Sequence, residues 1–171
     1  PDSRGIYTHE HVGLGHRRLS IIDTSYKGHQ PMTDASGQYT LVFNGEIYNY
    51  KELRQPLEKA GIGFESETDT EVLLQLLIRE GARCLPRLNG FFTFAFYNKG
   101  DGSLLLARDR MGIKPLMYYN DEDKLLFGSE LKAIMAFGIQ KELDPDSLCQ
   151  YLQFNYVPGT SSMLQGVQQL A

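Results

Sequence analysis

The stretch GFFTFAFY, residues 90 to 97, has aromatic and apolar residues on both faces of a predicted strand. Successive side chains of a strand point to opposite faces, so this pattern predicts a strand buried on both sides. The turn-forming sequence KGDG, residues 99 to 102, follows, and a second apolar run, SLLLARD, occupies residues 103 to 109. Strand, glycine-rich turn and strand in this order predict an antiparallel hairpin.

A second hairpin is predicted from LMYYN, residues 116 to 120, and KLLFGS, residues 124 to 129. Residues 39 to 43 also read as a strand, whereas residues 1 to 38 are rich in turn formers, with one clear apolar piece at residues 19 to 22. Because the strands gather in hairpins and do not alternate with helices, the pattern favours an α+β fold with antiparallel sheets.

The first predicted helix begins after Asn49, which stands as N-cap with Glu52 at the third helical position, as in a capping box. The helix runs through Ala60 and is expected to stop at Gly61. Pro56 lies inside it and lacks the N–H of a helical hydrogen bond, so a kink or an early break is expected there.

A second capping box is predicted at Thr68 and Glu71, and the helix that follows carries a core-facing apolar stripe before it ends at Gly81. Three more helical segments are predicted, near residues 82 to 88, from Ser129 to before Gly138, and from Asp144-Pro145. The last residues, 156 to 171, are typical of a loop.

Composition excludes several classes of function. The chain has 171 residues, enough for one domain with a core, and its net charge is -4 without any basic run, which argues against nucleic acid and anionic membrane as partners. No apolar stretch approaches the roughly 20 residues that span a bilayer. Cys84 and Cys149 are expected to be reduced, buried thiols of a cytoplasmic protein. His9 and His11 lack further ligands nearby in sequence, so no metal site is expected.

Five polar or flexible residues at the ends of predicted elements could form a site: Arg18, Asn44, Gly45, Glu46 and Asp69. An α-amino acid needs a guanidinium for its carboxylate and carboxylates for its ammonium, and attack on a side-chain amide needs N–H donors for the oxyanion. Each residue also has an ordinary explanation: a solvated arginine, a turn after a strand, or an acid that complements a helix dipole. Sequence spacing alone does not choose between the two interpretations.

The charged stretch RDRMGIK, residues 108 to 114, is interpreted as a salt-bridged connection between the two hairpins, in preference to a catalytic role. The chain contains no phosphate-binding GxxxxGK[ST] loop and no GxSxG nucleophile motif.

Eight segments together resemble the glutaminase domain of glutamine-hydrolysing asparagine synthetases, which are class II glutamine amidotransferases of the N-terminal-nucleophile hydrolase superfamily. The resemblance covers essentially the whole chain. It implies a four-layer α/β/β/α sandwich of two antiparallel sheets between helices, here lacking its N-terminal strands. Residues 1 to 155 would form the truncated amidotransferase domain, and residues 156 to 171 the start of a connection to a synthetase domain. The segments are GHRRLSIIDTS (15–25), QPM (30–32), FNGEIYNY (43–50), TDTEVLL (68–74), LNGFFTFAFY (88–97), RDRMGIKPLMYY (108–119), FGSELKAI (127–134) and YVPGT (156–160).

The resemblance also implies roles for seven residues around a bound glutamine. The α-carboxylate would be held by Arg18, with main-chain groups around Leu19 and Ile21. The α-ammonium would be held by Glu46 and Asp69. The oxyanion hole would be formed by the Asn44 side chain and the Gly45 N–H.

The family's nucleophile is a cysteine at the mature N-terminus, whereas this chain begins with Pro1-Asp2, so the 171 residues alone are expected to be inactive. The parent protein is expected to be a cytoplasmic asparagine synthase that hydrolyses glutamine and uses the ammonia for ATP-dependent conversion of aspartate. ATP and Mg²⁺ would bind in the C-terminal synthetase domain of the same polypeptide, with no cofactor in this part. A homodimer is left open. The alternatives are a non-catalytic glutamine-binding or regulatory relic, and an amidotransferase of this branch that acts on another carboxylate.

Overall fold

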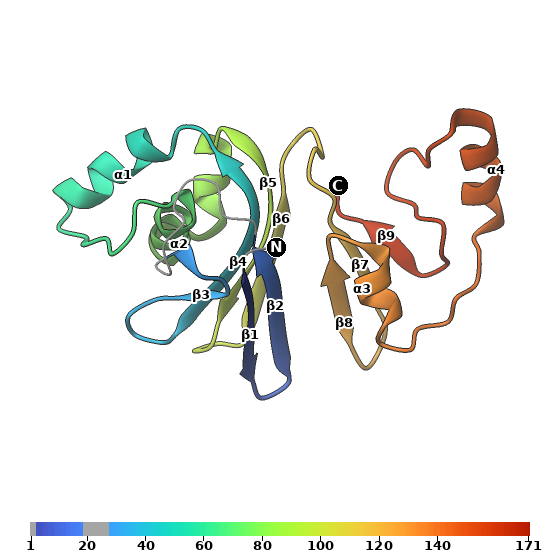
Figure 1. Cartoon of the computed structure of the whole chain (residues 1–171), viewed down its shortest axis with the longest axis horizontal. Helices are drawn as coiled ribbons and strands as arrows, with labels where there is room; N and C mark the ends of the chain where they lie inside the picture. Colours follow the sequence, from blue (N-terminus) through green and yellow to red (C-terminus); the bar gives the residue numbers. More distant parts are fainter. Residues whose placement is uncertain (1–2, 19–27) are drawn as a thin grey trace. The chain divides into compact units, whose positions relative to one another are not determined.

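The structure is a computed structural model that describes residues 3 to 18 and 28 to 171, with the backbone alone at Arg18 (Figure 1). These residues form two compact units that divide between Ala107 and Arg108.

The first unit is built on a four-stranded antiparallel sheet with the strand order β3-β4-β5-β6. The strands are β3 (Met32–Thr33), β4 (Tyr39–Ile47), β5 (Gly90–Asn98) and β6 (Ser103–Arg108). The longest ladder joins β4 to β5 over nine residues of each strand, from Tyr39 opposite Asn98 to Ile47 opposite Gly90. Strands β5 and β6 are also hydrogen-bonded neighbours, which confirms the predicted hairpin at residues 90 to 109.

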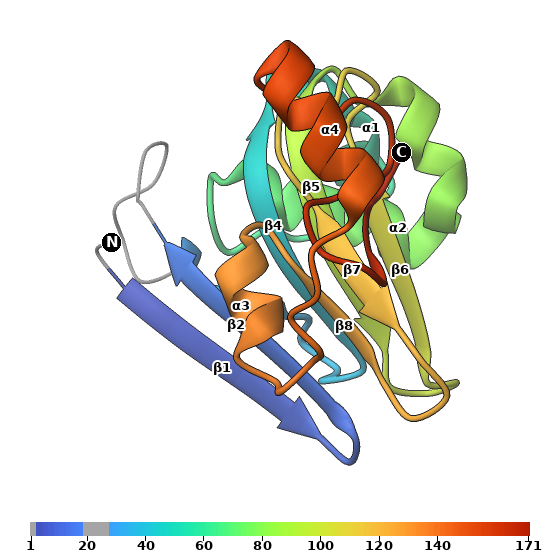
Figure 2. The ribbon, with the colours of Figure 1, turned by 90° about the vertical axis from the view of Figure 1, so that its right-hand side faces the viewer.

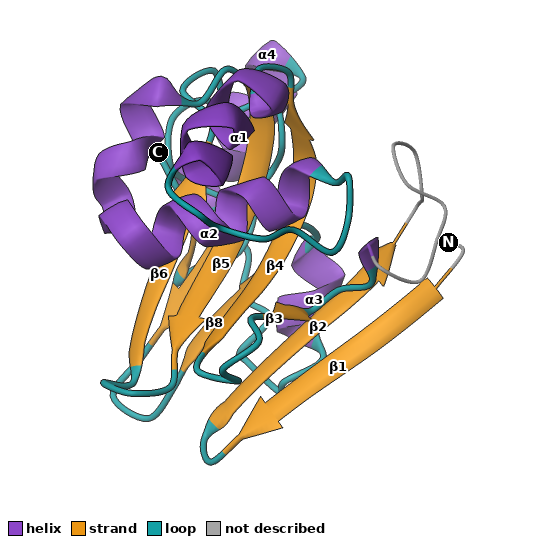
Figure 3. Ribbon diagram, turned by 90° about the vertical axis from the view of Figure 1, so that its left-hand side faces the viewer, coloured by secondary structure: helices purple, strands orange, loops and turns teal. Residues whose placement is uncertain are grey.

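Helices cover one face of this sheet (Figure 3). They are α1 (Tyr50–Lys59), α2 (Asp69–Glu80) and the 3-10 helix η2 (Gly81–Arg87). The core between helices and sheet includes Leu41, Phe43, Ile47, Leu53, Leu57, Val72, Leu73, Leu76, Leu77, Phe92, Phe94 and Phe96. The apolar stripe predicted for the helix after Thr68 thus faces the sheet.

A separate two-stranded hairpin, β1 (Ser3–His9) and β2 (Val12–Arg18), packs on the opposite face of the sheet (Figure 2). Tyr97 points away from the helices, since its neighbours Phe94 and Phe96 belong to the helical core and side chains alternate along a strand. Its hydroxyl lies 3.1 Å from His9 Nδ1, and its ring centroid lies 6.2 Å from that of Tyr7. Helices, sheet and hairpin form successive layers, which confirms the predicted α+β class with stacked antiparallel sheets.

The second unit contains a three-stranded sheet of order β8-β7-β9, formed by β7 (Met117–Asn120), β8 (Leu125–Gly128) and β9 (Val167–Gln169). Helix α3 (Leu131–Met135) packs against this sheet and contributes Ile134 to a small core with Ile139, Leu164 and Val167. Helix α4 (Pro145–Phe154) begins as predicted, with Asp144 as N-cap and Pro145 at the first helical position.

The sequence interpretation does not predict three strand pairings, which join β1 to β2, the short β3 to β4, and β7 to β9. Residues 3 to 18 form β1 and β2 although they were interpreted as turn-rich, because their many glycines, histidines and arginines hide the alternation of exposed and half-buried positions. The C-terminal residues were interpreted as a loop, but β9 pairs with β7. A strand of three residues is too short to show a period. The boundary at residue 155 stays a prediction.

The structure differs from several predictions about where and how the helices begin and end. Asn49 is at the N-cap position of α1 but its side chain makes no capping bond, and α1 continues through Pro56 to Lys59 without the early break. Thr68 does cap α2, whereas the Glu71 carboxylate binds residues 65 and 66 instead of the Thr68 N–H. The N-cap position of α3 is Glu130, not Ser129.

The connection at residues 108 to 114, which is predicted to be salt-bridged, is held in part by hydrogen bonds between its side chains and the backbone. The buried Asp109 carboxylate accepts the N–H groups of Met111, Ile113 and Lys114. The Arg108 guanidinium donates to the carbonyl oxygens of Lys114, Gly112 and Leu170. Local backbone partners satisfy these charges, so the stretch is a structural corner.

Candidate functional site

The candidate residues Asn44, Gly45 and Glu46 lie inside a strand. The sequence interpretation ended this strand at Phe43 and placed a turn after it, but β4 continues to Ile47 and keeps its pairing with β5. Since Phe43 and Ile47 face the helices, the alternation of side chains directs Asn44 and Glu46 to the opposite face, the one that carries the β1–β2 hairpin. The candidate site therefore starts between the two stacked sheets.

Gly45 is required by the close approach of β5. A Cβ at residue 45 would overlap the carbonyl oxygen of Phe91 and lie 2.6 Å from the Cα of Phe92. Gly90, diagonally across the ladder, has the same property, because its Cβ would overlap the carbonyl oxygen of Glu46. The two glycines let the strands approach closely beside Glu46, so Gly45 has a structural reason to be glycine whatever its role toward a ligand.

Asp69 is brought to the end of β4 from the start of α2. Its Oδ2 accepts the backbone N–H of Ile47 at 3.0 Å, and the residue is 5% exposed. Burial raises the pKa of the Asp69 carboxyl above its ordinary value of 3.8, backbone hydrogen bonds from Ile47 and Thr70 oppose this, and the charge of Glu46 raises the pKa further. The structure thus places the Asp69 carboxylate against the backbone of Ile47, directly after Glu46, although Asp69 and Glu46 are 23 positions apart in the sequence.

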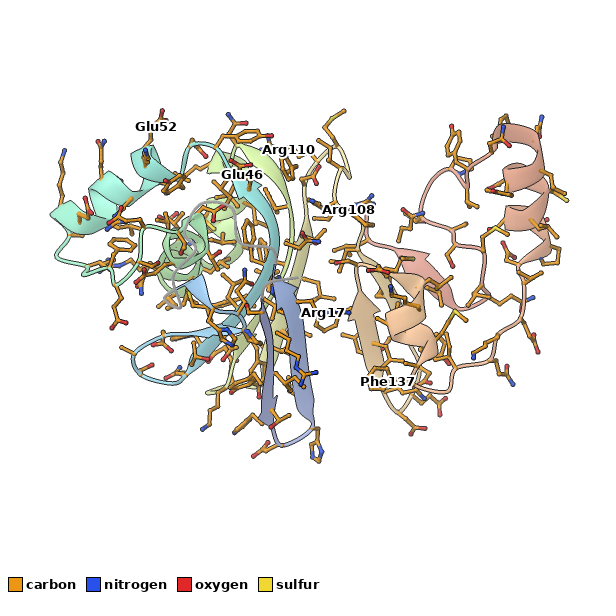
Figure 4. All side chains as sticks on the ribbon, viewed as in Figure 1. Arg17, Glu46, Glu52, Arg108, Arg110 and Phe137 are labelled. Carbon is orange, nitrogen blue, oxygen red and sulfur yellow. The ribbon has the colours of Figure 1, made fainter. Side chains whose placement is uncertain are left out.

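This pair of carboxylates has no cationic partner within 4 Å in the described part of the chain. Glu46 is half-buried at the end of β4 that leads into α1, whereas Glu52 stands exposed on the first turn of α1 (Figure 4). A primary ammonium between the two carboxylates would relieve their mutual repulsion and receive charge-assisted hydrogen bonds. The arrangement is suited to an amino group of a small molecule.

Gln30 supports the same strand and was not chosen as a site residue from the sequence. It is 5% exposed, and its Oε1 accepts the N–H of Phe43 at 2.6 Å. Strand β3 pairs with β4 only at Leu41 and Thr40, so the side chain of Gln30 provides the next hydrogen bond that a strand would have supplied. The available signal is the QPM segment, residues 30 to 32, which is one of the segments that carry the family resemblance but has no role assigned to it.

The carboxylate-binding part of the predicted site lies mostly outside the described residues. Arg18 is the last residue of β2, and only its backbone is described. Leu19 and Ile21 fall in the range that is not described, so their roles stay predictions, as do the oxyanion roles of Asn44 and Gly45. In the described ranges, no group of three or more His, Cys, Asp or Glu side chains could hold a metal ion. None of the helices described is long and apolar enough to cross a membrane.

Comparison with known proteins gives one consistent result. The family described as glutamine amidotransferase domain matches residues 1 to 171. The chain is 45% identical over 163 residues to glutamine-hydrolysing asparagine synthetase 1 of Bacillus subtilis strain 168, covering 95% of the chain and 26% of that protein. It is 36% identical over 191 residues to the putative glutamine-hydrolysing asparagine synthetase 2 of Methanocaldococcus jannaschii, covering 99% of the chain and 36% of that protein.

Solved structures agree with the sequence relatives. The glutamine phosphoribosylpyrophosphate amidotransferase of B. subtilis, complexed with ADP and GMP, superposes with a TM-score of 0.63 at 27% identity. The match covers 78% of this chain and 31% of that one. The chain therefore spans between 26% and 36% of the length of these relatives.

Stacked antiparallel sheets, a helical layer and a carboxylate pair at the end of a central strand define an amidotransferase-type α+β domain. The chain belongs to the glutamine amidotransferase domain family.

Proposed function

We propose that the carboxylates of Glu46 and Asp69 bind the α-ammonium of glutamine, and that the parent protein hydrolyses the side-chain amide of this glutamine to glutamate and ammonia. The observation that carries the proposal is the convergence of these two carboxylates, without a cationic partner in the described residues, in a domain of the glutamine amidotransferase family. Arg18 is assigned to the α-carboxylate, and Asn44 with the Gly45 N–H to the oxyanion.

The nucleophile is assigned to a cysteine outside the 171 residues, as the family resemblance implies. Cys84 is unsuited to the role, because it is fully buried and burial, with the charge of Glu80, raises the pKa of its thiol to about 11. The 171 residues alone are therefore expected to bind glutamine without hydrolysing it.

The destination of the ammonia follows from the relatives. Two of them are named as glutamine-hydrolysing asparagine synthetases, so we infer that ammonia passes to an activated aspartate in a synthetase domain of the same polypeptide. ATP and Mg²⁺ are assigned to that domain, since this chain has no phosphate-binding loop motif. A cytoplasmic location and a homodimer stay predictions.

The proposal is tested in the full-length protein with the variants Asp69→Asn and Glu46→Gln. Each removes one charge from the ammonium site, and a hydrogen bond to a charged group contributes about 1.5–3 kcal/mol, so the KM for glutamine should rise about 10- to 150-fold. Asparagine formation from free ammonia should keep its rate, because ammonia does not need the site.

Glu52→Gln is the matched control, since Glu52 is an exposed glutamate on the first turn of α1. It should leave the glutamine KM unchanged. An equal loss of glutamine-dependent and ammonia-dependent synthesis in the Asp69 and Glu46 variants would contradict the assignment.

A further inference from the structure

The loop between α1 and α2 is held by a buried hydrogen-bond network around Glu71. The Glu71 carboxylate accepts the N–H of Glu65 at 2.9 Å, the N–H of Ser66 at 2.7 Å and the hydroxyl of Ser66 at 2.5 Å. Glu71 and Ser66 are only 8% and 4% exposed. A buried carboxylate is tolerated when hydrogen bonds satisfy it, so the three donors and the acid stabilise one another.

The same network caps the helix that carries Asp69. The Ser66 hydroxyl lies 2.8 Å from the Thr68 hydroxyl, which accepts the N–H of Glu71 at 3.2 Å and so caps α2. Arg54 adds an outer contact, donating to the carbonyl oxygen of Ser66 at 3.0 Å. The loop is thereby bound to the first turn of α2 on both sides of Asp69.

The packing of α2 on the sheet brings Asp69 to β4, and hydrogen bonds set the place of its carboxylate there. Its carboxylate reaches β4 through the single N–H of Ile47, next to Glu46. A shift of the first turn of α2 would move the carboxylate relative to Glu46, and a displacement of about 1 Å is enough to weaken a charge-assisted contact substantially. The geometry of the ammonium site thus depends on a glutamate that does not touch it.

We propose that Glu71 is a positioning residue for the glutamine α-ammonium: its carboxylate holds residues 65 and 66 against α2 and so sets the place of Asp69 beside Glu46. This inference rests on the proposed function. Glu71 acts through Asp69, and its effect is confined to substrates that carry an α-amino group.

The test compares glutamine with glutaramate, which is glutamine without its α-amino group, in the full-length protein. Glu71→Gln keeps the size of the side chain but replaces one acceptor oxygen by an NH₂ group, which cannot accept the loop N–H donors. We expect kcat/KM for glutamine to fall about tenfold, mainly through KM, a change of about 1.4 kcal/mol. The kcat/KM for glutaramate should stay within about twofold of wild type, because Asp69 has no ammonium to bind there.

Glu65→Gln is the matched control, since the Glu65 side chain is exposed in the same loop and its contact with Glu71 is made by the backbone N–H, which the substitution keeps. This control should leave kcat/KM unchanged for both glutamine and glutaramate. Ser66→Ala is a second variant that removes one donor to Glu71 and the hydroxyl beside Thr68, and it should show the same selective loss of kcat/KM for glutamine, with glutaramate spared, as the Glu71 variant. It is used in place of Glu71→Gln if that variant does not fold.

Equal losses for both substrates would overturn the inference and leave Glu71 with a merely structural role. No loss for either substrate would overturn it as well. Measuring Asp69→Asn with the same two substrates distinguishes a failure of the Glu71 positioning role from a failure of the proposed ammonium site. If Asp69→Asn impairs glutamine selectively and Glu71→Gln does not, only the positioning role fails; if Asp69→Asn has no effect, the ammonium site itself is refuted.

Discussion

At the residue scale, Gly45 and Gly90 set how closely β4 and β5 approach beside Glu46. A methyl group at either position would overlap a carbonyl oxygen of the neighbouring strand. Backbone atoms cannot move aside as a flexible side chain can, so the whole ladder would have to separate. The glycines therefore belong to the structural frame of the site.

Gly45→Ala and Gly90→Ala should each lower the free energy of unfolding by roughly 1–3 kcal/mol, the usual cost of inserting a group into a packed interior. Gly63→Ala is the control, because its Cβ would meet nothing within 4 Å. Urea denaturation followed by circular dichroism measures the difference. Equal stability of the Gly45 and Gly63 variants would contradict the close approach.

The protonation state of Asp69 affects the stability of the folded protein. Its pKa is raised in the folded protein by burial, with a further contribution from the charge of Glu46. A raised folded pKa means that Asp69 favours folding when it is protonated, and that this favourable contribution is lost as the pH rises through the folded pKa. The carboxylate that the ammonium site needs is thus a cost to stability at neutral pH.

Asp69→Asn should therefore change stability relative to wild type in a pH-dependent way. The variant should gain on wild type as the pH rises from below the ordinary aspartate pKa of about 3.9 through the raised folded pKa, because only the wild type has to ionise a buried acid there. Chemical denaturation at several pH values measures it. If the stability difference between Asp69→Asn and wild type is constant with pH, the pKa of Asp69 is the same in the folded and the unfolded protein, which would contradict the prediction.

At the element scale, the two central helices begin in different ways. Thr68 caps α2 through its own hydroxyl, as the sequence predicts. Asn49 stands at the same position of α1, but its Nδ2 donates to the carbonyl oxygen of Arg87 at 3.0 Å and its Oδ1 accepts the N–H of Asn89 at 3.0 Å. Asn49 therefore joins the start of α1 to the segment that leads into β5.

Because of this difference, conservative substitutions at positions 49 and 68 should have different effects on stability. Asp is as good an N-cap as Asn, but at position 49 it cannot donate to Arg87 and places a carboxylate beside a carbonyl oxygen. Asn49→Asp should lower the free energy of unfolding by about 1–3 kcal/mol, the cost of an unsatisfied polar contact. Thr68→Ser should be nearly neutral, because serine keeps the capping hydroxyl. A neutral Asn49→Asp variant in thermal denaturation would mean that Asn49 acts as an ordinary cap.

At the scale of the whole molecule, the two thiols differ in exposure and chemistry. Cys84 is fully buried in the core of the first unit, whereas Cys149 is exposed on α4. The sequence interpretation expected both to be buried, and Cys149 corrects it. Burial raises the pKa of Cys84 to about 11, so its thiol is both inaccessible and protonated at neutral pH.

Alkylation should consequently distinguish the two cysteines. In native protein iodoacetamide should modify Cys149 and leave Cys84 intact, and Cys84 should react only as the first unit unfolds in denaturant. Mass spectrometry of peptides after short exposure measures both. Cys149→Ser is the control that leaves a single thiol, and fast native labelling of Cys84 in that variant would refute its burial.

The order and type of most elements can be predicted from local sequence patterns. The aromatic run at residues 90 to 97, its glycine-rich turn and the apolar stripe after Thr68 depend on local periodicity and turn chemistry, which a sequence displays directly. The family resemblance, carried by segments in fixed order, was also readable without coordinates, and so were the candidate residues.

Three features follow from the folded chain and not from local patterns: the end of the strand at residues 39 to 47, the close contacts of Gly45, and the position of Asp69 beside Ile47. The Asn-Gly pair that resembles a turn is held in a strand because β5 supplies its ladder partners, and Asp69 reaches Glu46 through packing of α2 on the sheet. Glu71, Gln30 and Asn49 gain their roles from bonds to residues that local patterns do not relate to them. The physical reason is that hydrogen bonding and burial depend on spatial neighbours, and a one-dimensional pattern contains only the chain neighbours.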